Sequence, residues 1–293
     1  MSSSYTASGT WKCNAESFTG RIMDITQSGV KTNVSTTNGM IQPGSFRVVA
    51  GPCTVESYEQ FQSSAKVVKQ AGYEYIRGGA FKPRTSPYSF QGLGEEGLKI
   101  LSEVSGDFGL KAVTEVLDPG DIELVMEHAQ IIQIGARNMA NFSLLKSVGA
   151  AIAGTDNGVV LKRGFSATVD EWLLAAEYIT SAGGDNVVLC ERGIRTFETS
   201  TRFTLDLSAV IVAKRLTDLP VIVDPSHAAG RRDLVVPLSK ASVAAEADGL
   251  IVESHHDPQE ALCDAEQALP VEALLGLRET LQPFASAMGR EVI

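Results

Sequence analysis

The sequence predicts an α/β protein built as a (β/α)8 barrel with a short irregular N-terminal extension. From residue 47 onward, eight short β-branched runs alternate with segments of helical periodicity. The 293 residues fit either two domains of roughly 150 residues or one large single-core fold. Eight strand and helix units in about 250 residues are typical of the barrel. We therefore expect an extension over 1–46 and a barrel over 47–293, with an open doubly wound sheet as the alternative.

Each predicted strand is a short, mainly apolar run rich in β-branched residues. In chain order the strands are Arg47–Cys53, Tyr75–Ala80, Lys111–Val116, Ile131–Ala136, Val159–Gly164, Asn186–Gly193, Pro220–His227 and Gly249–His255. Two of the intervening helices have a recognisable start. Ser57 with Gln60, and Thr168 with Glu171, fit the capping box, in which both side chains satisfy free backbone N–H groups.

Composition excludes several classes of protein. Hydrophobic residues make up 44% of the chain and charged residues 20%, which is ordinary for a globular protein and not for a disordered or coiled-coil one. The net charge is -10, from 25 basic and 35 acidic residues, and argues against nucleic-acid binding and against an anionic membrane surface. No apolar run approaches the roughly 20 residues of a membrane span. We expect neither nucleic acid nor membrane as a partner.

Cysteine usage indicates a reducing compartment. Cys13, Cys53, Cys190 and Cys263 show no CxxC spacing and follow no secretory segment, so we expect a cytoplasmic protein without a disulfide framework. The first residues are rich in Ser and Thr and poor in acids, which leaves an organelle transit peptide as the alternative. We expect residues 1–46 to cap the barrel or to join an oligomer contact.

Polar side chains gather where the predicted strands end, which is where barrels of this kind carry their chemistry. In strand order they are Cys53, Arg77 with Lys82 and Arg84, Glu115, Arg137, Lys162, Arg192 with Arg195, His227 and Glu253. Packing alone does not explain eight strand ends with such side chains. The sequence therefore predicts a reactive site at this end of the barrel.

Closure of a barrel brings strands 7, 8 and 1 side by side. His227, Glu253 and Cys53 then converge, and Asp264 in the following loop can supply a fourth ligand. A thiolate, an imidazole and two carboxylates suit Mn, Fe, Co or Zn better than Mg or Ca. Taken singly, each residue is more often structural, since cysteine is usually a small buried apolar residue. Their joint placement favours a metal site.

The rest of the predicted site is cationic. Arg77, Lys82 and Arg84 occur without an acid between residues 76 and 90, and the second half of the chain adds Lys162, Arg163, Arg192, Arg195 and Arg202. Arginine forks suit phosphate and carboxylate oxygens. We therefore expect small phosphorylated substrates. The alternative, that these are solvated surface charges, fits poorly with strand-end positions flanked by glycine.

Six segments together resemble the 3-deoxy-D-arabino-heptulosonate 7-phosphate (DAHP) synthases. They are Gly51–Glu56, Arg77–Gly94, Gln133–Met139, Leu161–Gly164, Cys190–Glu198 and Asp224–His227. The likeness is to the type I enzymes in their short bacterial-type form, without a ferredoxin-like regulatory domain. It implies a metal-dependent enzyme that condenses phosphoenolpyruvate with erythrose 4-phosphate, the first step of the shikimate pathway of aromatic amino acid biosynthesis.

The resemblance also implies roles for individual residues. It implies Cys53, His227, Glu253 and Asp264 as metal ligands, with manganese the expected ion. It implies Arg77, Lys82, Arg137, Lys162 and Arg195 at the phosphoenolpyruvate site, and Arg84 with Thr85 at the aldose-phosphate site. Lys82, His227 and Cys53 are the expected catalytic residues, with Lys82 as proton donor to the aldehyde oxygen. We expect a homo-oligomer, either a dimer or a tetramer.

Departures from the family pattern leave alternatives open. Phe203 stands where the family usually has asparagine, and Glu253-Ser-His-His and Asp264-Ala-Glu-Gln differ from the usual sequences around the last two ligands. A specialised-metabolism relative that joins phosphoenolpyruvate to a different aldehyde is therefore the alternative function. The sister 3-deoxy-octulosonate 8-phosphate synthase fits the Lys82–Ser86 segment less well. A barrel without activity, serving as a binding subunit, is the alternative from another class.

Overall fold

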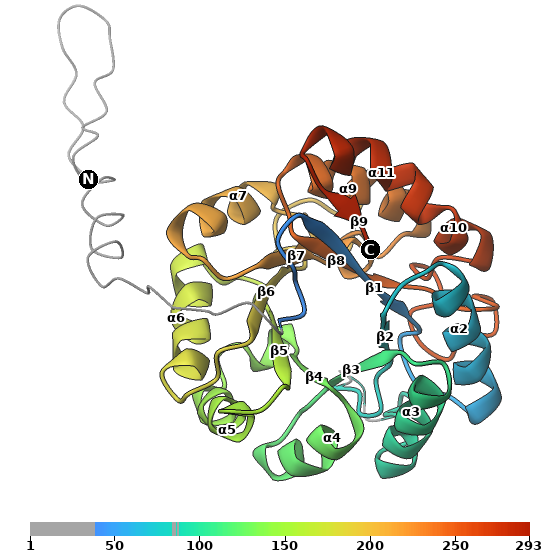
Figure 1. Cartoon of the computed structure of the whole chain (residues 1–293), viewed down its shortest axis with the longest axis horizontal. Helices are drawn as coiled ribbons and strands as arrows, with labels where there is room; N and C mark the ends of the chain where they lie inside the picture. Colours follow the sequence, from blue (N-terminus) through green and yellow to red (C-terminus); the bar gives the residue numbers. More distant parts are fainter. Residues whose placement is uncertain (1–38, 84–85, 87) are drawn as a thin grey trace, which may run out of the picture. The chain divides into compact units, whose positions relative to one another are not determined.

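The computed structural model describes residues 39–83, 86 and 88–293. In this part of the chain eight parallel strands follow one another around a ring, and helices surround them (Figure 1). Strand β1 pairs with β8 through Arg47–Gly51 and with β2 through Val49 and Ala50, which closes the sheet. The predicted (β/α)8 TIM barrel is confirmed, and the open doubly wound sheet is excluded.

The barrel strands are Ser45–Gly51 (β1), Tyr75–Arg77 (β2), Lys111–Glu115 (β3), Ile131–Ile134 (β4), Gly158–Lys162 (β5), Val187–Glu191 (β6), Val221–Val223 (β7) and Gly249–Glu253 (β8). The outer helices are Tyr58–Gln70 (α2), Glu95–Asp107 (α3), Ile122–His128 (α4), Phe142–Ile152 (α5), Val169–Thr180 (α6), Leu207–Leu216 (α7), Arg232–Ala244 (α9), Val271–Leu275 (α10) and Leu277–Ala287 (α11). Shorter elements are Pro119–Asp121 (η1), Ala136–Asn138 (η2), Pro225–Ala229 (α8) and Glu291–Val292 (β9), the last of which pairs with the start of β1.

The strand predicted over Pro220–His227 is wrong at its C-terminal end. Strand β7 stops at Val223, and Pro225 begins the short helix α8, in which His227 lies. Proline is favoured at the first position of a helix, because the N–H that it lacks would have no hydrogen-bond partner within the helix. The Asp224 side chain caps the helix by accepting a hydrogen bond from the His227 N–H at 2.9 Å. His227 therefore reaches the site from a helix and not from a strand end.

The core has an inner and an outer layer, because successive side chains of a strand point to opposite faces. In β1, Val48 packs among the residues that face the helices, whereas Val49 joins the inner cluster with Val113, Val160 and Ile251. Met40 and Ile41, from the segment before β1, belong to the inner cluster. Strand β1 itself begins at Ser45, and Cys190 is fully buried in the inner layer.

The predicted helix starts differ in detail. At Thr168 both halves of the capping box form, because the hydroxyl accepts from the Glu171 N–H and the Glu171 carboxylate accepts from the Thr168 N–H. Ser57 accepts from the Gln60 N–H, but the Gln60 side chain accepts from the Glu56 N–H instead of completing the box. Both helices nevertheless begin where they were predicted to begin.

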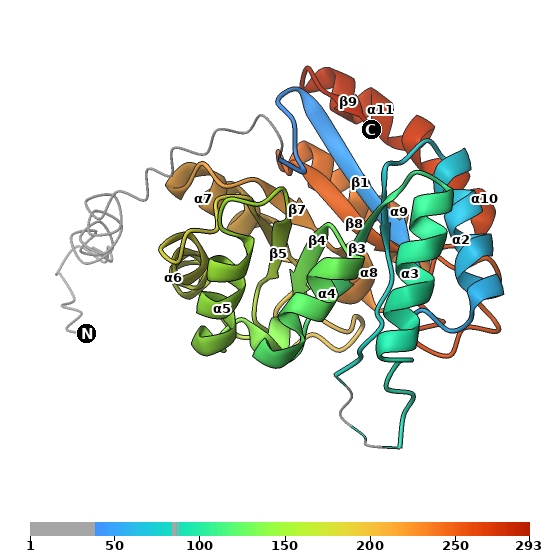
Figure 2. The same ribbon diagram turned by 60° about the horizontal axis from the view of Figure 1, so that its bottom comes forward.

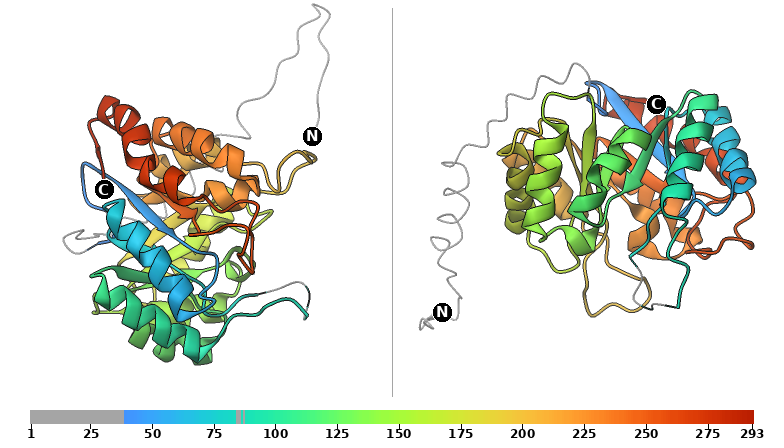
Figure 3. Two further views of the ribbon diagram at one scale, coloured as in Figure 1. Left: turned by 90° about the vertical axis from the view of Figure 1, so that its right-hand side faces the viewer. Right: turned by 90° about the horizontal axis from the view of Figure 1, so that it is seen from below.

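The C-terminal ends of the strands carry the long connections. The segment between β6 and α7 folds back on itself through an antiparallel bridge between Ile194 and Thr204 and extends away from the barrel (Figure 3). At the side of the barrel, α11 packs on α9 and α10 packs on α2 (Figure 2). In the part of the chain that the structure describes, no helix is both long and apolar enough to cross a membrane.

Candidate metal and anion site

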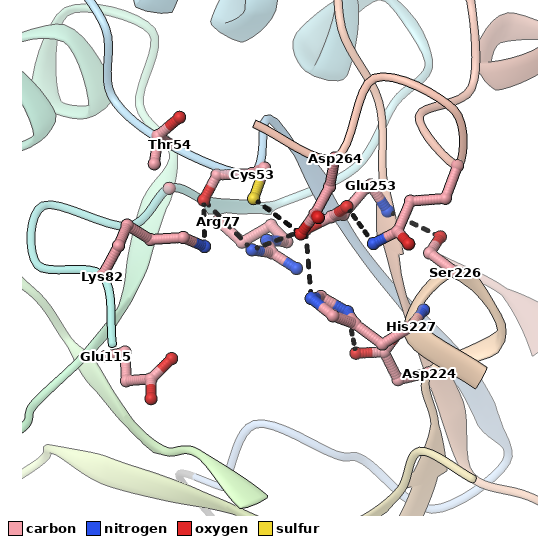
Figure 4. A network of polar contacts seen from close by, with 12 residues as sticks. Cys53, Thr54, Arg77, Lys82, Glu115, Asp224, Ser226, His227, Glu253 and Asp264 are labelled. Carbon is pink, nitrogen blue, oxygen red and sulfur yellow. Dashed lines mark hydrogen bonds and ion pairs between the residues drawn. The ribbon is translucent and has the colours of Figure 1, made fainter. Parts of the chain in front are cut away.

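Four potential metal ligands converge at the C-terminal ends of β7, β8 and β1 (Figure 4). Ligand atoms of Cys53, Glu253 and Asp264 lie within 4.8 Å of one another, and the Cys53 Sγ lies 3.3 Å from the Asp264 Oδ2. His227 joins them through its Nε2, which lies 3.3 Å from the Glu253 Oε1. The structure thus brings together all four residues that the sequence placed at a metal.

Neighbouring side chains hold the ligands in place. The buried Asp224 Oδ2 lies 2.7 Å from the His227 Nδ1 and 2.6 Å from the Lys162 Nζ. Burial lowers the pKa of His227, although Asp224 and Glu253 act in the opposite direction. A neutral imidazole that donates Nδ1–H to Asp224 directs the Nε2 lone pair at the ligand cluster, the arrangement by which carboxylates orient metal-binding histidines.

Glu253 is fully buried, and its two oxygens differ. Oε2 accepts a hydrogen bond from the Gln267 amide at 2.5 Å, whereas Oε1 accepts none and lies 3.2 Å from the Arg77 Nη2. Burial alone would raise the pKa of this carboxyl, but His227 and Arg77 outweigh it and the pKa is lowered. Glu253 is therefore ionised, with one oxygen left for a ligand.

The other two ligands differ in charge state. A hydrogen bond with Cys263, together with burial, raises the pKa of Cys53 well above its usual value. Burial opposes ionisation of Asp264, but the neighbouring His227 and Arg202 outweigh burial and lower its pKa to about 2. The donor set offers a thiol sulfur, an imidazole nitrogen and two carboxylates, which fits a divalent transition metal. The buried Glu253 Oε1, which accepts no hydrogen bond, supports the same fit.

A cavity of about 380 Å³ opens beside the ligand cluster. Of the described residues that line it, seven are cationic and only Glu115 and Asp264 are acidic. The cations are Arg77, Lys82, Arg137, Lys162, Arg192, Arg195 and Arg202. In a protein of net charge -10, this local reversal makes the cavity a site for small anions.

Lys82 lines the cavity beside the ligand cluster (Figure 4). Its Nζ donates a hydrogen bond to the Cys53 carbonyl at 3.0 Å, on the side of the cavity where Glu115 also lies (Figure 4). Burial disfavours its charged form, but Cys53, Glu253 and Glu115 outweigh that effect and raise the pKa of Lys82. The ammonium group keeps its proton at neutral pH and can donate it to a strongly basic oxygen.

The remaining cations fall into two groups. Lys162 and Arg163 are paired with acids, Lys162 with Asp224 at 2.6 Å and Arg163 with Glu191 at 2.9 Å. Arg163 is absent from the cavity wall and holds the β5 and β6 ends together. Arg192 is different, because it is buried and its Nη1 lacks any hydrogen-bond partner. Burial lowers the pKa of Arg192, as expected for a guanidinium without a counter-ion.

The cavity contains residues to which the sequence assigns no individual role. Arg192 belongs to the cations from which phosphorylated substrates are expected, but the family resemblance gives it no place at either substrate, although its position directly after β6 is a sufficient signal. Phe165 and Phe203 also line the cavity. Phe203 was noted only as a departure from the family pattern, and Phe165 carried no signal. Arg84, Thr85 and Cys13 lie outside the described residues.

Comparison with known proteins identifies the family of this chain. Residues 30–288 match the DAHP synthetase I family. The phospho-2-dehydro-3-deoxyheptonate aldolase of Thermotoga maritima is 50% identical over 249 residues, which are 85% of this chain and 72% of that enzyme. A 2-dehydro-3-deoxyphosphooctonate aldolase of Pasteurella multocida is 32% identical over 230 residues, 73% of this chain and 79% of that enzyme.

Solved structures agree as well. The crystal structure of the Thermotoga maritima DAHP synthase superposes with a TM-score of 0.82 at 49% identity, and covers 86% of this chain and 73% of that one. A truncated form of the DAHP synthase from the same organism gives a TM-score of 0.80 at 47% identity, with 86% of this chain and 91% of that one covered. Sequence and fold agree, and the chain belongs to the DAHP synthetase I family.

Proposed function

We propose that this protein condenses phosphoenolpyruvate with erythrose 4-phosphate to give DAHP and inorganic phosphate. The observation that carries the proposal is the cationic cavity directly beside the cluster of Cys53, His227, Glu253 and Asp264. An anion site next to a metal site suits a reaction in which a phosphorylated nucleophile meets a polarised carbonyl group. The 50% identical relative is named for this product, which adds support.

Phosphoenolpyruvate carries about three negative charges, and a single cation would leave much of that charge unpaired once water is excluded. Arg137, Arg192 and Arg195 meet its phosphate group from the outer wall of the cavity. Arg77 and Lys82 lie nearer the ligand cluster and meet the carboxylate end. Lys162 contributes its charge while its Nζ stays bonded to Asp224.

Cys53, His227, Glu253 and Asp264 would hold a divalent metal, with manganese the expected ion. When bound, the metal supplies Lewis-acid polarisation of the acceptor aldehyde. We assign His227 to metal binding and not to proton transfer, because its Nδ1 is engaged by Asp224 and its Nε2 faces Glu253. Arg84 and Thr85 remain the proposed site for the phosphate of the aldose.

The bond changes then follow in order. C3 of phosphoenolpyruvate attacks the aldehyde carbon, and Lys82 donates its proton to the aldehyde oxygen, which becomes a hydroxyl group. Water adds at the now electron-poor C2 and loses one proton, which restores the Lys82 ammonium group, and a phosphohemiketal results. The bond between C2 and the phosphate oxygen then breaks, the C2 hydroxyl becomes the ketone of DAHP, and its proton leaves with inorganic phosphate. Arginine side chains that already surround the phosphate stabilise the charge on the leaving group.

The test is an acceptor panel with manganese present. Phosphoenolpyruvate is mixed with erythrose 4-phosphate, arabinose 5-phosphate or a series of unphosphorylated aldoses, and released phosphate and product mass are followed. The proposal requires erythrose 4-phosphate to be the best acceptor and the product to have the mass of DAHP. A better turnover with another aldehyde would support the alternative function raised by Phe203. Absence of turnover with every acceptor would contradict the assignment of an active enzyme.

A further inference from the structure

Three arginines of the cavity surround one aromatic ring. Phe165 follows β5, and its ring centroid lies 5.5 Å from the guanidinium carbon of Arg137, 4.9 Å from that of Arg192 and 5.3 Å from that of Arg195. Arg137 comes from the β4 end, and Arg192 and Arg195 come from the β6 end. All three distances lie within the roughly 6 Å over which a cation is attracted to a ring.

These three arginines have no ion-pair partner in the part of the chain that the structure describes. Among the described residues, no carboxylate lies within ion-pair distance of any of the three guanidinium groups, whereas Arg77, Lys162, Arg163 and Arg202 each contact one. Three like charges in one wall repel each other, and burial of the Arg192 Nη1 without a partner adds to the cost. A carboxylate would relieve this repulsion but would also compete with an anionic substrate. The negative face of an aromatic ring attracts the cations and leaves their N–H groups for a ligand.

Phe203 supports the same arrangement. Its ring stacks on Phe165 with centroids 5.0 Å apart and planes 7° from parallel, and lies 4.2 Å from the Arg192 guanidinium carbon. The backbone fixes both rings, since the Phe203 N–H donates to the Ala228 carbonyl and the Arg195 N–H donates to the Phe165 carbonyl. Gly193 is needed beside them, because a Cβ there would lie 2.7 Å from the Phe203 Cβ.

We propose that Phe165, supported by Phe203, is a positioning residue that gathers Arg137, Arg192 and Arg195 into one phosphate-binding group. The identity of the ligand as phosphoenolpyruvate rests on the proposed function. The arrangement itself requires only an anion with a phosphate group. Leucine at position 165 fills similar space but has no negative face, and therefore separates an electrostatic role of the ring from simple packing.

The experiment measures equilibrium binding of phosphoenolpyruvate and of inorganic phosphate by calorimetry, together with steady-state kinetics. The variants are F165L and F165Y, and F142L is the matched control. Phe142 also stacks on a second ring, that of Tyr178, but it lies on α5 and is absent from the cavity wall. We expect F165L to weaken binding of both ligands roughly fivefold to thirtyfold, the equivalent of one or two cation–π contacts. KM for phosphoenolpyruvate should rise while kcat changes less.

Rescue by an aromatic substitution distinguishes the proposed positioning role of Phe165 from a purely structural role. F165Y keeps an aromatic face and should bind within about twofold of the parent, and F142L should match the parent. Unchanged binding in F165L, or an equal loss in F165L and F165Y, overturns the proposal. If F165L does not fold, as judged by circular dichroism, F203L takes its place and should weaken binding through Arg192, with F203Y as its rescue. If the parent protein binds phosphate yet makes no DAHP, the proposed function is wrong, and the binding results still decide the role of Phe165.

Discussion

Asp224 is the residue through which the anion site and the ligand cluster meet. Its Oδ2 lies 2.6 Å from the Lys162 Nζ and 2.7 Å from the His227 Nδ1, and its Oδ1 caps α8. Burial would raise the pKa of Asp224, but His227 and Lys162 outweigh it and keep the pKa well below the usual value. One ionised carboxylate thus sets the tautomer of His227 and the position of Lys162.

Replacement of Asp224 by asparagine should weaken metal binding. The D224N amide is neutral and has one oxygen instead of two. It cannot both cap α8, as Oδ1 does, and accept from His227 and Lys162, as Oδ2 does, so His227 loses its orientation. We expect manganese affinity, measured by calorimetry, to fall roughly tenfold to a hundredfold, as is usual when the partner of a metal-binding histidine is removed. The control is D185N at an exposed position between α6 and β6, which should keep the parent affinity. An affinity of D224N within twofold of the parent would argue against this role.

Lys82 is the residue proposed to protonate the aldehyde oxygen. In K82M the side chain keeps similar length but loses the proton, and kcat at saturating substrate should fall roughly a hundredfold or more, the usual contribution of general acid catalysis. K66M, at an exposed position on α2, is the control and should turn over like the parent. A K82M enzyme that retains kcat within tenfold of the parent would remove Lys82 from the chemistry.

Among individual residues, the sequence predicted those whose neighbours follow from the order of the strands in the barrel. Cys53, His227 and Glu253 are grouped because barrel closure makes strands 1, 7 and 8 neighbours, with Asp264 from the following loop, and the structure brings all four together. Phe165 was missed because an apolar residue after a strand usually belongs to the core, and nothing in one sequence places three arginines around it. The pairing of Arg163 with Glu191 and Asp206 could not be predicted either, since it joins residues that lie far apart in the sequence.

Among the elements, the loops after β1 and β8 are joined by Glu56. Its Oε1 accepts from the Thr54 hydroxyl and from the Leu262 N–H, each at 3.0 Å, and its Oε2 lies 3.8 Å from the His255 Nε2. Burial would raise the pKa of Glu56, but these donors and the His255 charge lower it from the usual value of 4.5. The carboxylate therefore contributes stability above pH 4.5 that is lost as the pH falls through its lowered pKa.

Low pH should remove the difference in free energy of unfolding between the parent and E56Q. In urea unfolding at pH 7 we expect E56Q to be less stable by about 1–2 kcal/mol, the size of a hydrogen bond to a buried charged group. The gap should shrink as the pH falls below about 4.5, because protonated Glu56 resembles glutamine. A gap that stays constant from pH 7 down to pH 3.5 would mean that ionisation of Glu56 does not contribute.

The order of the helices and strands was predicted more accurately than the residues at which they end. All eight strands appear in the expected order, because β-branched runs and helical periodicity are local signals. The sequence predicts a strand through His227 where the structure has helix α8, because Asp224-Pro225 is compatible both with a strand end and with a helix start. The fold of the β6 to α7 connection, held by the bridge between Ile194 and Thr204, depends on contacts that no local pattern encodes.

In the whole molecule, barrel closure places cationic side chains in the cavity and two carboxylates in the ligand cluster beside it. The chain is acidic by ten charges, yet the cavity at one end of the barrel is lined mainly by arginine and lysine. The ligand cluster concentrates two carboxylates, Glu253 and Asp264, in the barrel mouth. Such a cluster is costly without a cation and favourable with one, so metal binding should stabilise the entire fold.

Manganese should therefore raise the melting temperature of chelator-treated protein. At a hundred times Kd, a ligand that binds only the folded state adds about 2.7 kcal/mol, and for a protein of this size that corresponds to roughly 4 °C. E253Q should lose most of this shift, and E272Q, at an exposed position on α10, should keep it. An equal shift in E253Q and the parent would place the metal elsewhere.

The most direct test of the site is a crystal of the protein grown with manganese and phosphoenolpyruvate, examined by anomalous diffraction at the manganese edge. We predict one strong anomalous peak bounded by Cys53, His227, Glu253 and Asp264, with the phosphate group of phosphoenolpyruvate against Arg137, Arg192 and Arg195. A manganese peak away from these four residues, or phosphoenolpyruvate bound outside the cavity, would contradict the account.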